Sequence, residues 1–292
     1  ETVYQNALAY AKERLQMRAA VRPENRSKEP ADPIIMHPAV QRMLMSQKAY
    51  AEGGRMLAYY SSLLLDGAEH HPDSSQRAEF EGQLALLTPV IKAMLTDQGF
   101  EAASQAIQIF GGHGYIQETG VEQYLRDIKI AQIYEGTNEI QAIDLIMRKI
   151  LADNGLRLFN LLDEVQATIE ATTEPDLLNA VAALTQVSKS LRALVPAVAQ
   201  AIKNTPDLPF QIAPEMLRLV GHTAMGWLWL KAAHIAFKNK EIDPPFYNSK
   251  INTAQYYFDF ILPETRQLLQ VIDQHLIHSQ QGRSTNYMDS LM

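Results

Sequence analysis

Apolar residues recur every three or four positions along most of the chain, which is the spacing that one face of an α-helix requires. One face of a first helix is marked by Val3, Ala7, Leu8, Ala11 and Leu15. A second helix is predicted from Pro38 to about Leu65, because a proline at the first turn of a helix gives up no hydrogen bond. A third is predicted over about 75–98, with Pro89 expected to kink it or to lie in a break.

Glycine and asparagine divide the rest of the pattern. A short helix over about 101–110 is predicted to end at Gly111-Gly112, and another over 138–154 to stop at Asn154-Gly155. A short helix and then three long ones are expected beyond that point, the long ones over about 181–202, 214–239 and 249–279. Since no segment has the alternation of a strand, we predict an all-α chain of two helical domains, 1–155 and 156–292.

Composition narrows the classes of function. The 292 residues, 47% of them hydrophobic, can form substantial cores, and 26 basic against 33 acidic residues give a net charge of −7. With no Lys/Arg-rich block, a nucleic-acid partner is not expected. The absence of cysteine excludes disulfides, thiolate metal sites and a cysteine nucleophile. No apolar window is long enough to span a membrane, and we expect a cytoplasmic protein.

Two common kinds of catalytic site find no support in the sequence. None of the eight histidines has an acidic residue three positions before it, so the Glu-x-x-His pairs of di-iron bundles are absent and no metal site is expected. A Ser/His/Asp site usually tops a sheet, which an all-α chain lacks. Trp227 and Trp229 lie on different faces of one helix and are expected in the core or an interface rather than in a stacking platform.

Two polar segments differ from ordinary bundle sequence. Residues 108–115 place three glycines in four positions, which lets a ligand approach the backbone, although a glycine pair after a helix is more often only a C-cap. In residues 134–141, Thr137 or Asn138 can cap a helix, and Glu135 lies near that helix's positive end. From chemistry alone, such a carboxylate is more often a partner of the helix dipole than a catalytic base.

Taken together, these segments resemble the acyl-CoA dehydrogenase family. Residues 108–112 are similar to its Gln-x-x-Gly-Gly element, and Arg126-Asp127 followed by 133–137 to its base-bearing loop, with similarity continuing to Arg148. Residues 9–17 resemble the helix whose Arg-x-Gln-Phe-Gly end reaches the flavin of a neighbouring subunit. The resemblance covers about 1–155, the family's C-terminal four-helix bundle, and 156–292 are similar to an extra helical domain of a bacterial subgroup.

The resemblance implies a reaction and a set of site residues. The family oxidises an acyl-CoA thioester to the 2,3-enoyl-CoA, with Glu135 at the position of the base that removes the α-proton. The Glu135 backbone N–H would polarise the thioester carbonyl. Tyr134 and Gly136 would line the acyl thioester pocket. Arg14 and Gln16 would bind the FAD of a partner subunit, and Gln108, Gly111 and Gly112 would present groups to that same cofactor. Thr137 and Glu139 would contact the FAD of their own subunit.

The sequence also departs from the family pattern. Met17 and Arg18 stand where the family usually has Phe and Gly, so position 17 offers no aromatic ring to the neighbour's flavin. The proline-rich insert at 22–38 is longer than usual. The N-terminal and middle domains are missing, so we expect a fragment of a longer enzyme that acts as a homodimer or higher homo-oligomer. Electron-transfer flavoprotein is the expected electron acceptor. The alternative is a non-catalytic helical oligomerisation or interaction module.

Overall fold

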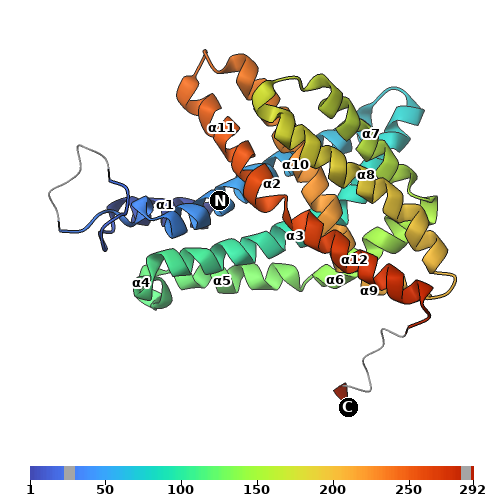
Figure 1. The fold of residues 1–292 in the computed structure, drawn as a ribbon, viewed down its shortest axis with the longest axis horizontal. Helices are drawn as coiled ribbons and strands as arrows, with labels where there is room; N and C mark the ends of the chain where they lie inside the picture. The colour runs from blue at the N-terminus through green and yellow to red at the C-terminus, as the bar shows by residue number, and fades with distance from the viewer. Residues whose placement is uncertain (23–29, 284–290) are drawn as a thin grey trace. The chain divides into compact units, whose positions relative to one another are not determined.

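The computed structural model describes residues 1–22, 30–283 and 291–292, and within these ranges it contains helices and one isolated bridge, between Leu15 and Pro33 (Figure 1). Part of the proline-rich insert expected at 22–38, Pro23 included, lies outside the described residues. The α-helices are α1 (Thr2–Glu13), α2 (Pro38–His70), α3 (Ser74–Phe110), α4 (Gly112–Tyr115), α5 (Val121–Lys129), α6 (Asn138–Asp144), α7 (Leu156–Ala171), α8 (Leu178–Ala201), α9 (Leu208–Gln211), α10 (Ala213–Asn239), α11 (Pro244–Tyr256) and α12 (Glu264–Gln280).

The helices form two compact units, each with its own set of residues. Unit 1 contains 1–55 and 95–134, and unit 2 contains 56–94 and 135–292. The long helices α2 and α3 therefore contribute residues to both units. None of the described helices is both long enough and apolar enough to span a membrane.

The core of unit 1 is built from small and aliphatic residues of α1, α2, α3 and α5. Tyr10 of α1 and Phe110 at the end of α3 stack with ring centroids 4.1 Å apart, which joins these two helix ends beside the core. This contact places the C-terminal ends of α1 and α3 next to each other. One cluster of buried core residues in the unit contains Ala7, Ala11, Ile34, Leu44, Ala106, Ile109 and Val121.

Unit 2 is organised around α10. This helix is apolar on nearly every face, which is typical of a helix surrounded by other helices. It packs against α6, α7, α8, α11 and α12 (Figure 1). Trp227 and Trp229, on different faces of α10, are 1% and 0% exposed, so the prediction that they belong to a core is confirmed.

Several predicted boundaries are confirmed. The second helix begins at Pro38, the helix before the glycine pair ends at Phe110, and α10 falls within one residue of its predicted limits. Asn154 and Gly155 both adopt positive φ, +56° and +84°, as a helix stop of this kind requires.

Other predicted boundaries are wrong near Gly99. The break expected between 98 and 101 is absent, because α3 runs without interruption from Ser74 to Phe110 and includes Pro89. A Cβ on Gly99 would lie 3.1 Å from Cγ1 of Ile128, so this glycine provides close approach to α5 rather than a helix end. The helix α5 itself was not predicted, since the glycines on both sides of it suggested a loop.

The predicted helices over 138–154 and 249–279 are also interrupted. After α6 the chain forms a π-helical segment, Leu145–Ile150, and a 3-10 turn, Leu151–Asp153. The last helix is two helices, α11 and α12, separated by a π-helical segment, Tyr257–Ile261, and by Pro263, which has no N–H to continue the hydrogen-bond ladder.

Candidate functional site

A pocket of about 690 Å³ with both apolar and polar lining residues lies in unit 1, where the ends of α1 and α3 meet the start of α2. All five residues predicted to bind cofactor from this unit line it, which brings together two segments more than 90 positions apart in the sequence. The lining residues are Arg14, Gln16, Gln108, Gly111 and Gly112 together with Tyr10, Met17, Ile34, His37, Ala39, Val40, Met43, Ile109, Phe110 and His113. Pockets of this size are typical of cofactor and small-molecule sites.

The wall that carries Arg14 and Gln16 is an extended loop held by backbone hydrogen bonds. The Gln16 N–H donates to the Asp32 carbonyl oxygen at 3.0 Å, and the Ile34 N–H donates to that of Arg14 at 2.8 Å. The buried Asp32 carboxylate accepts from Arg22 Nη2 at 2.6 Å and from the Ala19 N–H at 2.9 Å. The hydrogen bond from Arg22 is the main reason that the pKa of Asp32 is held below its usual value.

The opposite wall is formed by the glycine pair. Gly111 has φ +61° and ψ −139°, a conformation that side chains disfavour, whereas the φ of Gly112 is not positive. A Cβ built on either residue would meet no atom within 4 Å. The fold therefore requires glycine at position 111 but not at position 112, where the missing side chain leaves open space beside the pocket.

Three aromatic residues of this pocket were not predicted. His37 Nε2 lies 2.8 Å from the carbonyl oxygen of Gln16, and the Tyr10 hydroxyl lies 2.9 Å from His113 Nδ1. They come from α1, from the residue before α2 and from α4. His113 directly follows Gly112 in the sequence, whereas only the fold brings Tyr10 and His37 to the glycine pair.

The predicted acidic loop lies at the start of unit 2, where Tyr134 is the last residue of unit 1 and Glu135 the first of unit 2. Glu135 has φ +57°, in the left-handed region that non-glycine residues rarely adopt, and Gly136 follows with φ +87°. Thr137 is the N-cap of α6, its Oγ1 accepting from the Ile140 N–H at 3.4 Å. Tyr134, Glu135, Thr137 and Glu139 are all exposed.

The two backbone polar groups of Glu135 differ in their hydrogen bonding. The Glu135 carbonyl oxygen accepts from Gln141 Nε2 at 2.9 Å, while its N–H makes no hydrogen bond within the described part of the chain. Lys92, which the sequence analysis did not select, donates through Nζ to the carbonyl oxygen of Gly136 and to Asn138 Oδ1, both at 2.7 Å. The predicted residues thus fall into two groups, five at the pocket of unit 1 and four at the loop of unit 2, with Tyr134 at the junction.

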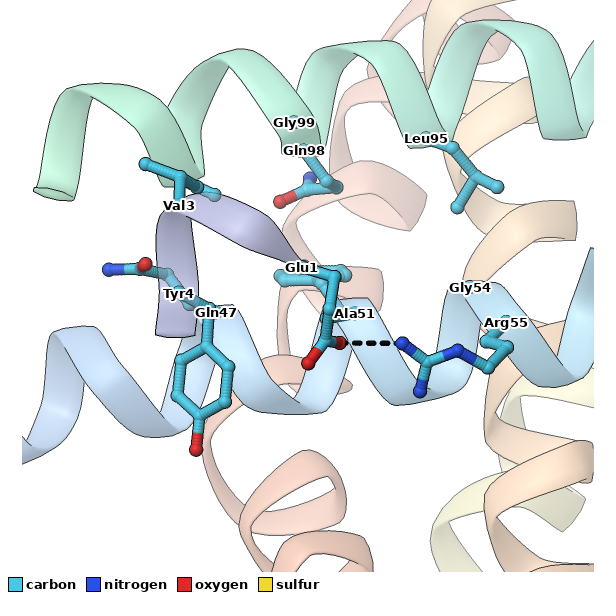
Figure 2. Close-up of a pocket in the computed structure, with 12 residues that line it drawn as sticks. Glu1, Val3, Tyr4, Gln47, Ala51, Gly54, Arg55, Leu95, Gln98 and Gly99 are labelled. Carbon is cyan, nitrogen blue, oxygen red and sulfur yellow. Dashed lines mark hydrogen bonds and ion pairs between the residues drawn. The ribbon is translucent and has the colours of Figure 1, made fainter. Parts of the chain in front are cut away.

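A second hollow of unit 1, about 320 Å³, lies among α1, α2 and α3 (Figure 2). At one end Arg55 Nη2 donates to the Glu1 carboxylate at 2.7 Å. Gln47, which also lines it, is 3% exposed, and neither of its amide atoms has a hydrogen-bond partner among the described residues. None of the predicted site residues lines this hollow.

Unit 2 contains two further clusters of polar side chains, both within its helical packing. In the first, the Tyr60 hydroxyl and Gln83 Nε2 donate to Glu164, and burial is the main cause that raises the pKa of Tyr60. In the second, Arg218 and His222 of α10 face Glu264 in the first turn of α12. Among the residues that the structure describes, no three His, Asp or Glu side chains are grouped closely enough to hold a metal ion.

Fold and site define an all-α protein with a cofactor-sized pocket and an acidic loop at the start of a helix, and the family comparison agrees with this class. The model described as "Acyl-CoA dehydrogenase, C-terminal domain" matches residues 1–151, and the one described as "Acetyl-CoA dehydrogenase C-terminal like" matches 161–275. The chain belongs to the acyl-CoA dehydrogenase family.

Individual relatives support this assignment. The chain is 38% identical to a 3-methylmercaptopropionyl-CoA dehydrogenase of Ruegeria pomeroyi, in an alignment that covers 90% of this chain. It is 31% identical to the broad-specificity linear acyl-CoA dehydrogenase FadE5 of Mycobacterium tuberculosis, in an alignment that covers 94% of this chain. It covers 45% and 48% of these two proteins, so the chain spans about half the length of the curated relatives it matches.

Among solved structures, an acyl-CoA dehydrogenase of Bacillus anthracis complexed with FAD shares the fold. Its TM-score is 0.67 at 16% identity, with 100% of this chain and 47% of that chain covered. The all-α fold class predicted from the sequence is therefore confirmed.

Proposed function

We propose that this chain is the C-terminal part of an FAD-dependent acyl-CoA dehydrogenase that oxidises a saturated acyl-CoA thioester to the 2,3-enoyl-CoA. The observation that carries the proposal is the convergence of Arg14, Gln16, Gln108, Gly111 and Gly112 on one pocket. Membership of the family and the printed names of the relatives support the same activity.

The residues present are suited to a flavin dinucleotide. Arg14 offers a charged, exposed donor for a pyrophosphate, and the side chains of Gln16 and Gln108 add hydrogen-bonding groups. The open space at Gly112 allows a planar group to approach the backbone. We propose that Arg14 and Gln16 serve the flavin of a partner subunit, which makes the enzyme a homodimer or higher homo-oligomer, and that Thr137 and Glu139 contact the flavin of their own subunit.

Glu135 is the proposed catalytic base. Its carboxylate would take the α-proton of the thioester, while Tyr134 and Gly136 line the pocket and exclude water, which makes a carboxylate a stronger base. The Glu135 N–H, which has no partner in the described chain, is available to the thioester carbonyl, where one such donor contributes about 10²–10³ in rate. FAD, when bound, supplies the acceptor for the hydride from the β-carbon.

The test uses the full-length enzyme with Glu135→Gln beside wild type and beside Glu170→Gln, an exposed glutamate of α7. Under anaerobic conditions with saturated acyl-CoAs of several lengths, we expect wild type and Glu170→Gln to lose flavin absorbance. Glu135→Gln should bind FAD but be reduced about 10²–10⁴ times more slowly, because proton removal lacks its base.

Two outcomes would contradict the proposal at different points. If the flavin of Glu135→Gln is reduced at the wild-type rate, Glu135 is not the catalytic base. A wild-type protein that binds no flavin would reject the dehydrogenase and favour the non-catalytic helical interaction module.

The remaining parts of the proposal concern organisation and surroundings. We propose a division into residues 1–155 and 156–292, supported by family matches that end at 151 and resume at 161. Electron-transfer flavoprotein is the proposed acceptor of electrons from the reduced enzyme, and the cytoplasm is its proposed location.

A further inference from the structure

The turn that carries Glu135 is held in an unfavourable backbone conformation. Glu135 and Gly136 both have positive φ, and a non-glycine residue keeps such a conformation only when neighbouring contacts impose it. The contacts that impose this conformation therefore set the position and direction of the Cα–Cβ bond of Glu135.

Hydrogen bonds from the side chains of Lys92, Asn138 and Gln141 hold this turn. Lys92 Nζ donates to the carbonyl oxygen of Gly136 and to Asn138 Oδ1, each at 2.7 Å. Asn138, which is 8% exposed, donates through Nδ2 to the carbonyl oxygen of Ala93 at 3.2 Å. On the other side, Gln141 Nε2 donates to the Glu135 carbonyl oxygen at 2.9 Å. The first three bonds connect the turn to the adjacent residues Lys92 and Ala93 of α3, and Lys92 makes two of them.

The position of this lysine is not explained by stabilisation of α6. A positive charge near the first turn of a helix is electrostatically unfavourable, because the N-terminal N–H groups are themselves positive. Lys92 is only half-buried, and a neutral donor of similar length would satisfy one of the two oxygens with less electrostatic opposition. What the ammonium supplies is two short charge-assisted bonds that fix the carbonyl oxygen next to Glu135 and the cap region of α6 at the same time.

We infer that Lys92 is a positioning residue for the catalytic base: by binding the Gly136 carbonyl oxygen and Asn138, it holds the turn in which Glu135 meets the α-carbon of the substrate. This inference rests on the proposed function. It assigns to Lys92 no contact with substrate or flavin and no proton transfer, since its effect passes through the backbone of the turn.

The experiment compares the full-length enzyme with Lys92→Met and with Lys189→Met, a matched removal of an exposed lysine on α8. FAD content, acyl-CoA affinity and the rate of anaerobic flavin reduction are measured, the last with normal and α-deuterated acyl-CoA. For Lys92→Met we expect FAD content and acyl-CoA affinity close to wild type. Reduction should be slower by about 10²-fold, which is the usual cost of a small displacement of a reacting group.

The isotope effect separates positioning from a general loss of structure. A misplaced base makes α-proton removal the slower step, so the α-deuterium effect on flavin reduction should rise in Lys92→Met and stay unchanged in Lys189→Met. Partially unfolded enzyme would lower the amplitude of reduction without changing the isotope effect of the molecules that react.

Each result decides between the hypotheses. Wild-type rate and isotope effect in Lys92→Met would overturn the inference, while failure of wild type itself to be reduced would overturn the proposed function instead. If Lys92→Met does not retain FAD, Lys92→Gln, which still offers a donor to one of the two oxygens, is measured in the same way and is expected to show the same slower reduction. Loss of FAD in both variants would overturn the inference, because Lys92 would then be required for folding rather than for placing the base.

Discussion

Gly111 and Gly112 are adjacent in the sequence, yet the structure requires only the first to be glycine. Gly111 adopts a backbone conformation that a side chain disfavours, whereas Gly112 has neither a positive φ nor a neighbouring atom within 4 Å of a Cβ. Because folding does not require glycine at position 112, which borders the open pocket, a substitution there tests cofactor binding separately from the stability of the fold.

We therefore expect Gly112→Ala in the full-length enzyme to leave the melting temperature near wild type and to weaken FAD binding. A methyl group that meets the cofactor costs about 1–3 kcal/mol, which corresponds to about a 5- to 150-fold increase in Kd. Flavin titration followed by fluorescence measures the change.

The neighbouring substitution is the control. Gly111→Ala should destabilise the fold by about 1–3 kcal/mol, because alanine is forced into a conformation that glycine alone adopts readily. Equal FAD affinity in Gly112→Ala and wild type would place the cofactor elsewhere.

How much of the site could be predicted differs from residue to residue. The glycine pair and Glu135 stand in short segments with unusual composition, which is why sequence patterns selected them. Lys92 and His37 have no such signal, because each acts on a backbone carbonyl that lies more than 20 positions away in the sequence. A hydrogen bond to a distant backbone oxygen requires no particular residue type at its acceptor, so only the folded chain shows it.

At the level of elements, α10 and α12 are linked by Glu264, which faces Arg218 and His222. Burial acts to raise the pKa of Glu264, but the hydrogen bond from His222 and electrostatic attraction to His222 and Arg218 outweigh it, so the pKa of Glu264 lies below its usual value. A carboxyl whose pKa is lower in the folded than in the unfolded state stabilises the fold when it is ionised.

The stabilisation by Glu264 should therefore be complete above its unfolded pKa and disappear as the pH falls through the folded value. We expect Glu264→Gln to unfold at a lower temperature than wild type near neutral pH, by a free energy of about 1–2 kcal/mol. As the pH falls from neutral into the acid range, the difference in melting temperature between the two proteins should shrink. A difference that stays constant over this range would contradict the assignment.

The predictability of the helices depended on what interrupts them. Long apolar periodicity was sufficient for α2 and α10. The sequence pattern predicts a break between 98 and 101, but in the fold Gly99 lies within α3 and makes room for Ile128. It also predicts no helix where the structure has α5. The periodicity of 249–279 continued across Pro263, since the π-helical segment before it keeps apolar residues buried while the hydrogen-bond ladder changes.

At the level of the whole molecule, packing in unit 2 joins residues from both sides of position 155. Tyr60 of α2 packs against Trp227 of α10 with ring centroids 4.9 Å apart. Tyr60 and Gln83 also donate to Glu164 of α7. Residues 56–94 therefore depend on helices that follow position 155 for part of their burial.

We expect residues 1–155, produced alone, to be less stable than the whole chain. Several apolar side chains would lose their cover at about 1.5–3 kcal/mol each, so the loss is on the order of 5 kcal/mol. Urea unfolding followed by circular dichroism, with binding of a hydrophobic dye as a second measurement, compares the fragment with residues 1–292. A fragment with the same midpoint as the whole chain and no dye binding would show two independent domains.

The placement of the two tryptophans has a consequence for spectroscopy. Both belong to α10 in unit 2, where the indole of Trp227 donates to Thr168 Oγ1 at 2.6 Å and Trp229 is fully buried. Intrinsic tryptophan emission from this chain therefore reports on unit 2 alone, while unit 1 contributes only tyrosine signal. A denaturation curve read from the red shift of that emission will describe a single unit, and its disagreement with a helicity curve would measure how independently the other unit melts.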